Sequence, residues 1–177
     1  NEIFKDRRGR WVESDHLDWE HLPVKIEAVI ERRFGMLPGE CQSLMSRACI
    51  QGEIFCVEIL SRISGKPERE IYEQLSEEVC KRHRLITAQG SQNFGGKRLT
   101  FFRFRHALFQ IYLYHQLNQV DKIQLHGLVA EEMEKLYKKH LSQYPEMAHT
   151  IARHYDLANI PQKAVYYYKL AGANAVR

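Results

Sequence analysis

The sequence lacks the features that mark membrane-spanning, secreted and zinc-finger proteins. No apolar stretch among its 177 residues approaches the length that crosses a bilayer. The chain begins NEIFKDRRGRW, and no apolar signal core follows these charges. No cysteine pair has CxxC spacing, and no histidine pair completes a zinc-finger pattern. We therefore expect a cytoplasmic protein with no membrane partner and no metal site.

The cysteines also indicate a reducing compartment. Cys41, Cys49 and Cys56 lie among apolar residues, and free cysteine is one of the residue types most often buried. We expect these three to be buried thiols without disulfide bonds. Such thiols are typical of intracellular proteins.

The composition is that of a globular protein with an uneven charge. Hydrophobic residues make up 44% and charged residues 27%, enough for a core with an ordinary polar surface. The net charge is +4, but residues 81–105 contain seven lysines and arginines and no acidic residue, so the rest of the chain sums to −3. A local basic segment of this kind calls for a functional explanation.

Residues 23–105 show helical spacing followed by β-like runs. Apolar residues recur at helical spacing in four segments, of which the third covers 55–63 and the fourth opens at Pro67. Two β-like runs follow at 85–87 and 99–104, joined by a loose tip over 89–97 that is rich in Gly, Ser, Asn and Gln. Helices followed by one hairpin is the order of a winged helix. Residues 1–22 are predicted to be a connector, with a short strand at Trp11-Val12.

Residues 106–177 are predicted to be helical throughout. One helix covers 107–118, and Asp121 is a plausible cap for a longer one. Tyr144-Pro145 and Ile160-Pro161 start two more, since proline favours the first turn of a helix. The predicted fold is mainly α, with a winged-helix-like domain over 23–105 and a helical stalk over 106–177.

The sequence contains no complete motif of the common enzyme classes. Gly90, Gly95, Gly96 and Lys97 approach a phosphate loop, but the lysine arrives one residue late and Arg98 replaces the Ser or Thr that holds magnesium. There is no HExxH and no local nucleophile signature. We therefore predict no catalytic residue and no enzyme activity for this chain.

The basic hairpin offers one alternative, which is DNA binding by a winged-helix transcription regulator. Arg84, Lys97 and Arg98 would then contact phosphates. The helix before a wing usually enters the major groove, however, and here it carries five carboxylates, from Glu68, Glu70, Glu73, Glu77 and Glu78. Because phosphate neutralisation supplies much of the affinity for DNA, this charge works against the alternative.

Two stretches resemble known families. Residues 22–55, LPVKIEAVIERRFGMLPGECQSLMSRACIQGEIF, with RFRHALFQ at 103–110, resemble the region after the ATPase core in STAND proteins, the signal-transduction ATPases with numerous domains. The most similar members are bacterial predicted ATPases attached to nucleotide cyclase, kinase or transcription-factor domains. Residues 151–175, IARHYDLANIPQKAVYYYKLAGANA, are similar to a tetratricopeptide helix pair.

The first resemblance implies a role for His106. In STAND proteins a histidine at this place, often within Met-His-Asp, contacts the phosphate of bound ADP and stabilises the closed state. Arg105 and Arg103 would add positive charge toward the same phosphate. Here Arg105 precedes the histidine and Ala107 follows it, so the role of the third motif residue does not carry over. The alternative is a histidine that only caps or packs at the junction.

The resemblance also implies partners and cofactors. The family's phosphate loop, magnesium-binding acidic strand and Gly-x-Pro motif are expected upstream, so ADP or ATP with Mg²⁺ would bind the parent protein's core and no cofactor would bind this chain. The winged helix would pack on that core, and the repeats would bind a protein partner or inducer. In the repeat pair we expect close helix packing by small residues and by two tyrosines that fill the gap, namely Ala152, Ala164, Ala171, Tyr155 and Tyr168.

Overall fold

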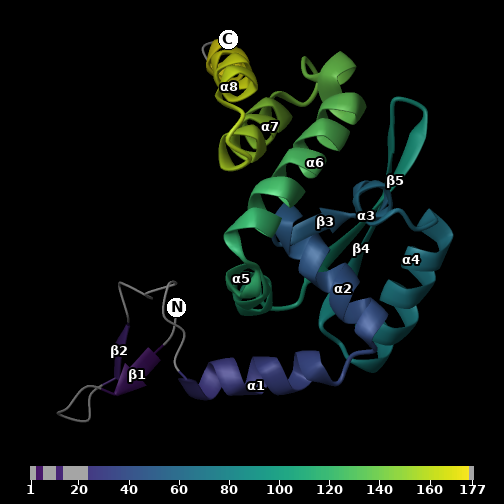
Figure 1. Ribbon diagram of the computed structural model, residues 1–177, viewed down its shortest axis with the longest axis vertical. Helices are drawn as coiled ribbons and strands as arrows, with labels where there is room; N and C mark the ends of the chain where they lie inside the picture. The colour runs from purple at the N-terminus through teal and green to yellow at the C-terminus, as the bar shows by residue number, and fades with distance from the viewer. Residues whose placement is uncertain (1–2, 6–10, 14–23, 176–177) are drawn as a thin grey trace.

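The computed structural model describes residues 3–5, 11–13 and 24–175. Strands β1 (Ile3–Lys5) and β2 (Trp11–Glu13) pair antiparallel, which confirms the strand predicted at Trp11-Val12. The rest of the predicted connector lies outside the described residues. Helix α1 (Val24–Gly35) then leads to the main body (Figure 1). None of the described helices is long and apolar enough to span a bilayer.

The body has the predicted winged-helix order. Its elements are α2 (Gly39–Ala48), η1 (Cys49–Gln51), β3 (Ile54–Cys56), α3 (Val57–Ser64), α4 (Glu68–Gln74), the π-helical η2 (Leu75–Arg82), β4 (Ile86–Phe94) and β5 (Lys97–Phe104). The sheet order is β3-β5-β4, antiparallel throughout. The helix predicted over 55–63 was wrong at its start, because Ile54–Cys56 is a strand in which Phe55 pairs with Phe102. A three-residue apolar strand is too short for periodicity to distinguish from helix.

The wing is longer and tighter than predicted. Residues 89–97 were expected to form a loose tip, but β4 extends to Phe94 and β5 starts at Lys97. Gly95 and Gly96 alone make the turn, with φ of 53° and 79°. Two consecutive positive φ values give the turn whose twist matches a β-hairpin, and glycine adopts them without strain.

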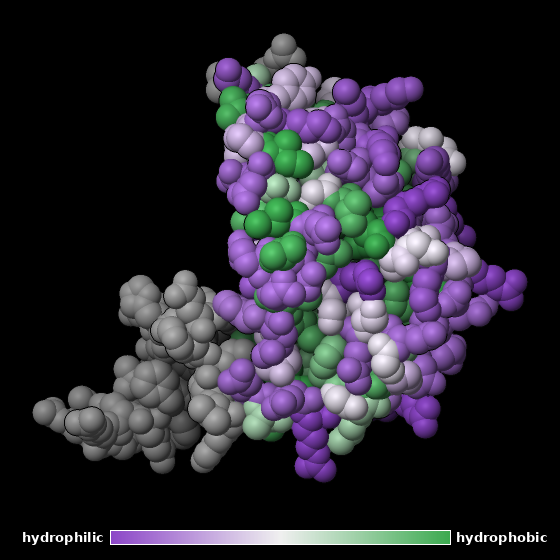
Figure 2. All heavy atoms as spheres, viewed as in Figure 1, coloured by the Kyte–Doolittle hydropathy of each residue, from purple (hydrophilic) through white to green (hydrophobic). Residues whose placement is uncertain are grey.

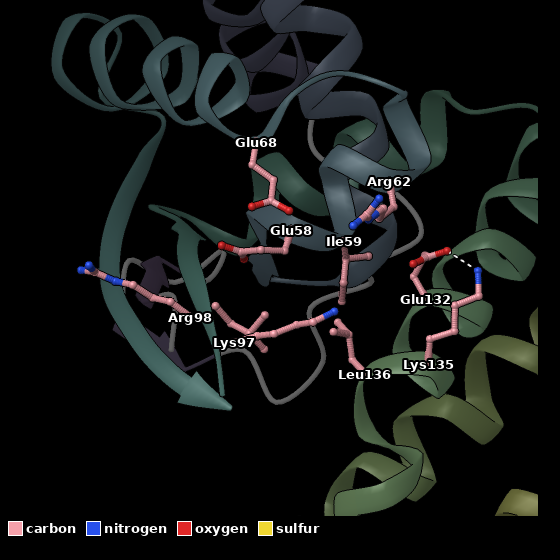
Figure 3. Close-up of a pocket in the computed structure, with 10 residues that line it drawn as sticks. Glu58, Ile59, Arg62, Glu68, Lys97, Arg98, Glu132, Lys135 and Leu136 are labelled. Carbon is pink, nitrogen blue, oxygen red and sulfur yellow. Dashed lines mark hydrogen bonds and ion pairs between the residues drawn. The ribbon is translucent and has the colours of Figure 1, made fainter. Parts of the chain in front are cut away.

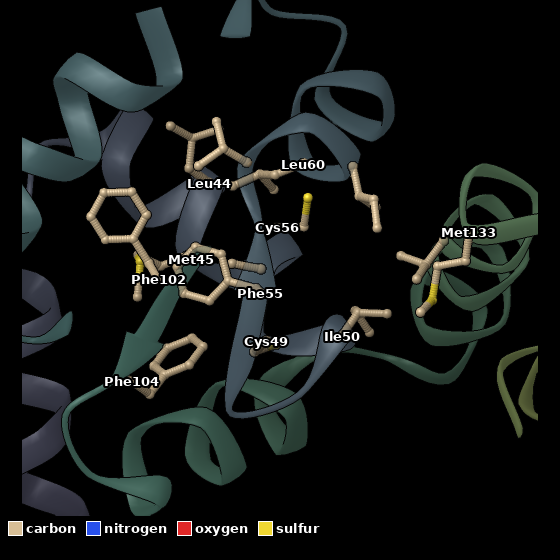
Figure 4. Close-up of a cluster of buried hydrophobic side chains, with 14 of the residues drawn as sticks. Leu44, Met45, Cys49, Ile50, Phe55, Cys56, Leu60, Phe102, Phe104 and Met133 are labelled. Carbon is tan, nitrogen blue, oxygen red and sulfur yellow. The ribbon is translucent and has the colours of Figure 1, made fainter. Parts of the chain in front are cut away.

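The core lies between the sheet and the helices of the body. Phe55, Phe102 and Phe104 form its aromatic centre, with the Phe55 and Phe104 ring centroids 5.4 Å apart (Figure 4). Phe102 and Phe104 therefore share the inner face of β5, since alternate residues of a strand point to the same side. Cys41, Cys49 and Cys56 are buried free thiols, which confirms that prediction.

The helical arm follows the sheet. It comprises α5 (Ala107–Gln116), α6 (Gln119–Tyr137), η3 (Lys138–His140), α7 (Pro145–Leu157) and α8 (Pro161–Ala175). The two helix starts predicted at prolines are confirmed. The prediction that Asp121 caps this helix was wrong. Asn118, three residues earlier, is the cap, and its Oδ1 accepts the Asp121 backbone N–H at 2.9 Å. Both residues suit a helix start, but an N-cap accepts from the amide three residues on.

Helices α7 and α8 form a helical hairpin closed by small residues. Ala152 and Ala164 are buried at the crossing, and Tyr155 stacks on Tyr167 at 6.0 Å. The prediction for Tyr168 was wrong, since it is 38% exposed while Tyr167 is 1% exposed. Successive helical residues differ by about 100°, so only one of three adjacent tyrosines can face α7. Ala171, which lies on the stripe of Ala164 and Tyr167, is partly buried.

The wing tip docks on the arm. Phe94 is 6% exposed, and its ring centroid lies 4.5 Å from those of Tyr137 and Tyr144 and 5.0 Å from that of His140. A Cβ on Gly95 would lie 2.6 Å from Nε2 of His140, so the close approach also requires glycine. A single hydrophobic core therefore runs from the body into the arm.

We expect Phe94→Ala to lower the free energy of unfolding by about 3 kcal/mol, because a large aromatic group is removed from a closed site. Urea unfolding followed by circular dichroism measures this change. Tyr166→Ala is a control, since Tyr166 is 57% exposed and its loss should cost less than about 1 kcal/mol. Equal losses for the two variants would contradict a packed wing tip.

Candidate functional site

The junction between β5 and α5 holds His106 in an exposed position. The backbone N–H groups of Phe104 and Arg105 donate to the carbonyls of Glu53 and Leu85, each at 2.9 Å, and fix the end of the strand. His106 is the N-cap residue of α5 in extended conformation, and its side chain makes no capping hydrogen bond. The imidazole is exposed, with its ring centroid 6.4 Å from that of Phe109. The side chain therefore does not cap the helix.

Of the two arginines expected to add positive charge at this junction, one is paired with a carboxylate and the other is not. Arg105 is exposed beside His106. Arg103, the other predicted contact, forms an ion pair with Glu53 at 2.7 Å, so its charge is already partnered. Arg33 of α1, which the sequence did not suggest, lies 5.2 Å over the Phe109 ring and donates to the His83 carbonyl at 3.0 Å. The spacing along the chain gave no indication of Arg33, because α1 reaches this corner only through the fold.

The residues predicted for nucleic acid do not form one surface. Arg84, with a positive φ of 54°, lies at the base of the wing, while Lys97 and Arg98 lie at its tip. Lys97 and Arg98 line a cavity of about 600 Å³ whose walls also carry Glu58, Glu68 and Glu132. In Figure 3 Lys97 extends toward Leu136 and Arg98 points the opposite way.

The basic side chains of the helix before the wing are paired with carboxylates of the same helix. Three ion pairs along α4 and η2 join basic residues to glutamates of the same helix: Arg69–Glu73, Lys81–Glu77 and Arg82–Glu78. The remaining carboxylates leave this surface without the excess positive charge that DNA phosphates require.

A buried histidine pair, which the sequence did not predict, joins α6 to α7. His126 and His154 are 3% and 5% exposed, and their Nδ1 atoms lie 2.8 Å apart. The Tyr114 hydroxyl of α5 lies 3.0 Å from Nε2 of His126. His149, five residues before His154 on α7, is exposed. No local spacing could reveal a partner 28 residues away.

The environment of the pair keeps both rings neutral at pH 7. Burial lowers the pKa of His126 to about 4 and that of His154 to about 3. The charges of Arg153 and Lys122 lower the pKa of His126 further, and His126 and Arg153 lower that of His154 further. Among residues 24–175, no three side chains of the kinds that bind metal converge on one point.

The pair borders a cavity of about 370 Å³ between η1, α5, α6 and α7. Its polar lining includes Gln51, Gln110, His115 and Arg153 beside the histidines and Tyr114. Ile50, Ile111 and Leu157 supply apolar walls. The cavity therefore combines an apolar enclosure with a few convergent polar groups, the usual character of a small-molecule site.

The comparisons give no relative from which to read a function. No protein-family model matches the sequence, and neither a curated protein nor a solved structure is significantly similar to it.

The histidine pair predicts a loss of stability in weak acid. Both pKa values are lowered in the folded state, so the unfolded chain binds more protons once the pH falls below the ordinary histidine value of about 6.5. We expect the free energy of unfolding to fall by on the order of 2 kcal/mol per histidine between about pH 6.5 and pH 5. Urea titrations at several pH values measure this slope.

A variant with both His126→Gln and His154→Gln supplies the control. Amides retain hydrogen-bonding groups but do not titrate, so the slope in this window should largely disappear. An unchanged slope in a folded double variant would contradict the assignment. Glu134 does not contribute to the slope in this pH window. Burial would raise its pKa, but hydrogen bonds from Lys163 and Tyr155 outweigh burial and hold the pKa at about 2, so the stability that Glu134 contributes is lost only below about pH 4.5.

Proposed function

We propose that this chain is the regulatory region that follows the nucleotide-binding core of a STAND-type signalling ATPase. In that role it couples the nucleotide state of the core to a helical-repeat arm that binds a protein partner or inducer. ADP or ATP with Mg²⁺ would occupy the upstream core, an output domain such as a nucleotide cyclase would respond, and the whole protein would act in the cytoplasm. The chain itself would perform no catalysis.

The observation that carries the proposal is the exposed side chain of His106 at the start of α5, where no side chain caps the helix. The first amides of a helix have no partner within the helix and favour a nearby anion. Arg105 and Arg33 add positive charge at the same corner. A phosphate brought to this corner by another domain would meet a histidine, an arginine and free amides. This fits the resemblance of RFRHALFQ to the ADP-contacting segment of STAND proteins.

The coupling role is supported by the elements that leave the junction. Strand β5 runs from Phe104 beside His106 back to the turn that holds Phe94 against the arm. Helix α5 runs from His106 into α6, which packs on both α3 and α7. Two rigid elements therefore link a displacement at the junction to the arm.

The arm offers a surface suited to a protein partner. Large hydrophobic side chains are exposed on three of its helices, at Leu128, Leu157, Val165, Tyr166 and Tyr168. Figure 2 shows hydrophobic side chains gathered around α6 and α7 while hydrophilic ones cover much of the remaining face. Exposed apolar surface of this kind favours protein contact. The DNA-binding alternative has weaker support, because the wing tip is docked and the helix before it is self-paired.

The test uses the longer protein that contains the upstream core. His106→Ala should speed ADP release about tenfold or more, since a hydrogen bond to a charged group contributes about 1.5–3 kcal/mol. Basal output should rise at the same time. Nucleotide content after gel filtration and the dissociation of a fluorescent ADP analogue measure the effect.

His149→Ala is the matched control, because His149 is an exposed histidine on α7. It should leave ADP release unchanged. If a folded His106→Ala protein keeps its nucleotide and its basal output as the wild type does, only a structural role remains for His106.

A further inference from the structure

The cavity beside the histidine pair is lined by positive charge and by no negative charge among the described residues. Arg153 is its charged lining residue, and no acidic side chain lines it within the described part of the chain. Lys122 lies nearby, with its Nζ 4.7 Å from the centre of the Tyr114 ring. Arg153 makes no ion pair with any residue between 24 and 175. A cavity with positive charge and no carboxylate favours an anion.

The hydrogen-bond chain links the proton positions on the two rings. Two neutral imidazoles that meet through their Nδ1 atoms share one proton, so one ring donates and the other accepts. The Tyr114 hydroxyl has His126 Nε2 as its one partner among the described residues. If His126 donated to Tyr114, the phenol proton would lack a protein acceptor. When Tyr114 donates to His126 and His126 donates to His154, the phenol proton and the shared ring proton both have an acceptor.

This order leaves one donor without a partner. His154 accepts at Nδ1 and, being neutral, must carry its proton on Nε2. No hydrogen bond to that nitrogen occurs within the described ranges, and His154 borders the cavity. An acceptor that enters the cavity can therefore take this proton.

We propose that the cavity between η1, α5, α6 and α7 binds a small organic oxyanion, whose carboxylate or phosphate group contacts Arg153 and the Nε2–H of His154. The Arg153 guanidinium presents two parallel donors that match either group. The apolar walls of Ile50, Ile111 and Leu157 enclose the body of the molecule. A volume of about 370 Å³ limits the ligand to the size of a metabolite.

This site is separate from the proposed nucleotide contact. It shares no residue with the corner of His106, Arg105 and Arg33, and it lies where η1 of the body meets α5, α6 and α7 of the arm. Such a ligand would join α5, α6 and α7, and it would thereby stabilise one arrangement of the arm. Failure of either proposal leaves the other standing.

The test measures binding of two probes, inorganic phosphate and benzoate, to the 177-residue chain. Nitrogen-15 NMR of the histidine side chains follows each titration, because the Nε2 resonance of His154 reports directly on a new acceptor. We expect one or both probes to shift this resonance with a dissociation constant in the millimolar range. Benzoate binding alone identifies a carboxylate site, and phosphate binding alone identifies a phosphate site. If neither probe moves the resonance at about ten times that concentration, the proposal is overturned.

Variants assign the contacts. Arg153→Gln should weaken binding about tenfold or more, while Arg62→Gln, which lines the other cavity, should leave it unchanged. Tyr114→Phe keeps the ring but removes the phenol that orients His126, so it should also weaken binding and should alter the proton distribution seen in the nitrogen spectrum. Binding that survives Arg153→Gln undiminished in a folded protein would contradict the site.

Discussion

The docking of Phe94 on the arm is the contact on which the rest of the structure depends. A wing tip is usually a free hairpin end, but here it is enclosed by Tyr137, Tyr144 and His140. The contact requires a two-glycine turn, because a side chain at Gly95 would collide with His140. It joins the sheet to the arm and adds to the packing of α6 on α3 and η1, so that the body and the arm form one packed unit. It also removes the wing tip from the surface that a DNA-binding winged helix would use.

The arm is held together by polar contacts as well as apolar ones. Glu134 of α6 accepts hydrogen bonds from Tyr155 of α7 and, at 2.8 Å, from Lys163 of α8. The His126–His154 pair joins α6 and α7 a second time. Polar networks have strict geometry, so they favour one relative position of the helices over its neighbours. A displacement of α6 is therefore expected to move α7 and α8 with it.

Features governed by local pattern were predictable from the sequence. The winged-helix order, the inward faces of Phe102 and Phe104 and the helix starts at Pro145 and Pro161 follow from alternation and from backbone chemistry. Features that depend on pairing across the chain were not predictable. The strand at Ile54–Cys56 exists because β5 is beside it, and Tyr167 is buried because α7 faces that side of α8.

The residues of the candidate sites also divide into those that local sequence could indicate and those that only the fold brings together. His106 and Arg105 could be named because they adjoin a strand-to-helix boundary visible in the sequence. Arg33 reaches the same corner from α1, 73 positions before His106, and His126 meets His154 across two helices. Such neighbours carry no signature in spacing, since their proximity arises only when the helices pack.

Native-state hydrogen exchange in increasing urea measures most directly whether the body and the arm are one cooperative unit. The amides of β5 around Phe102 and those of α7 around Ile151 report on the two halves. If the wing contact unites them, both sets should converge on the same global opening, with equal free energy and equal urea dependence. Exchange of the α7 amides through a separate opening, lower by several kcal/mol than that of β5, would contradict a single coupled unit.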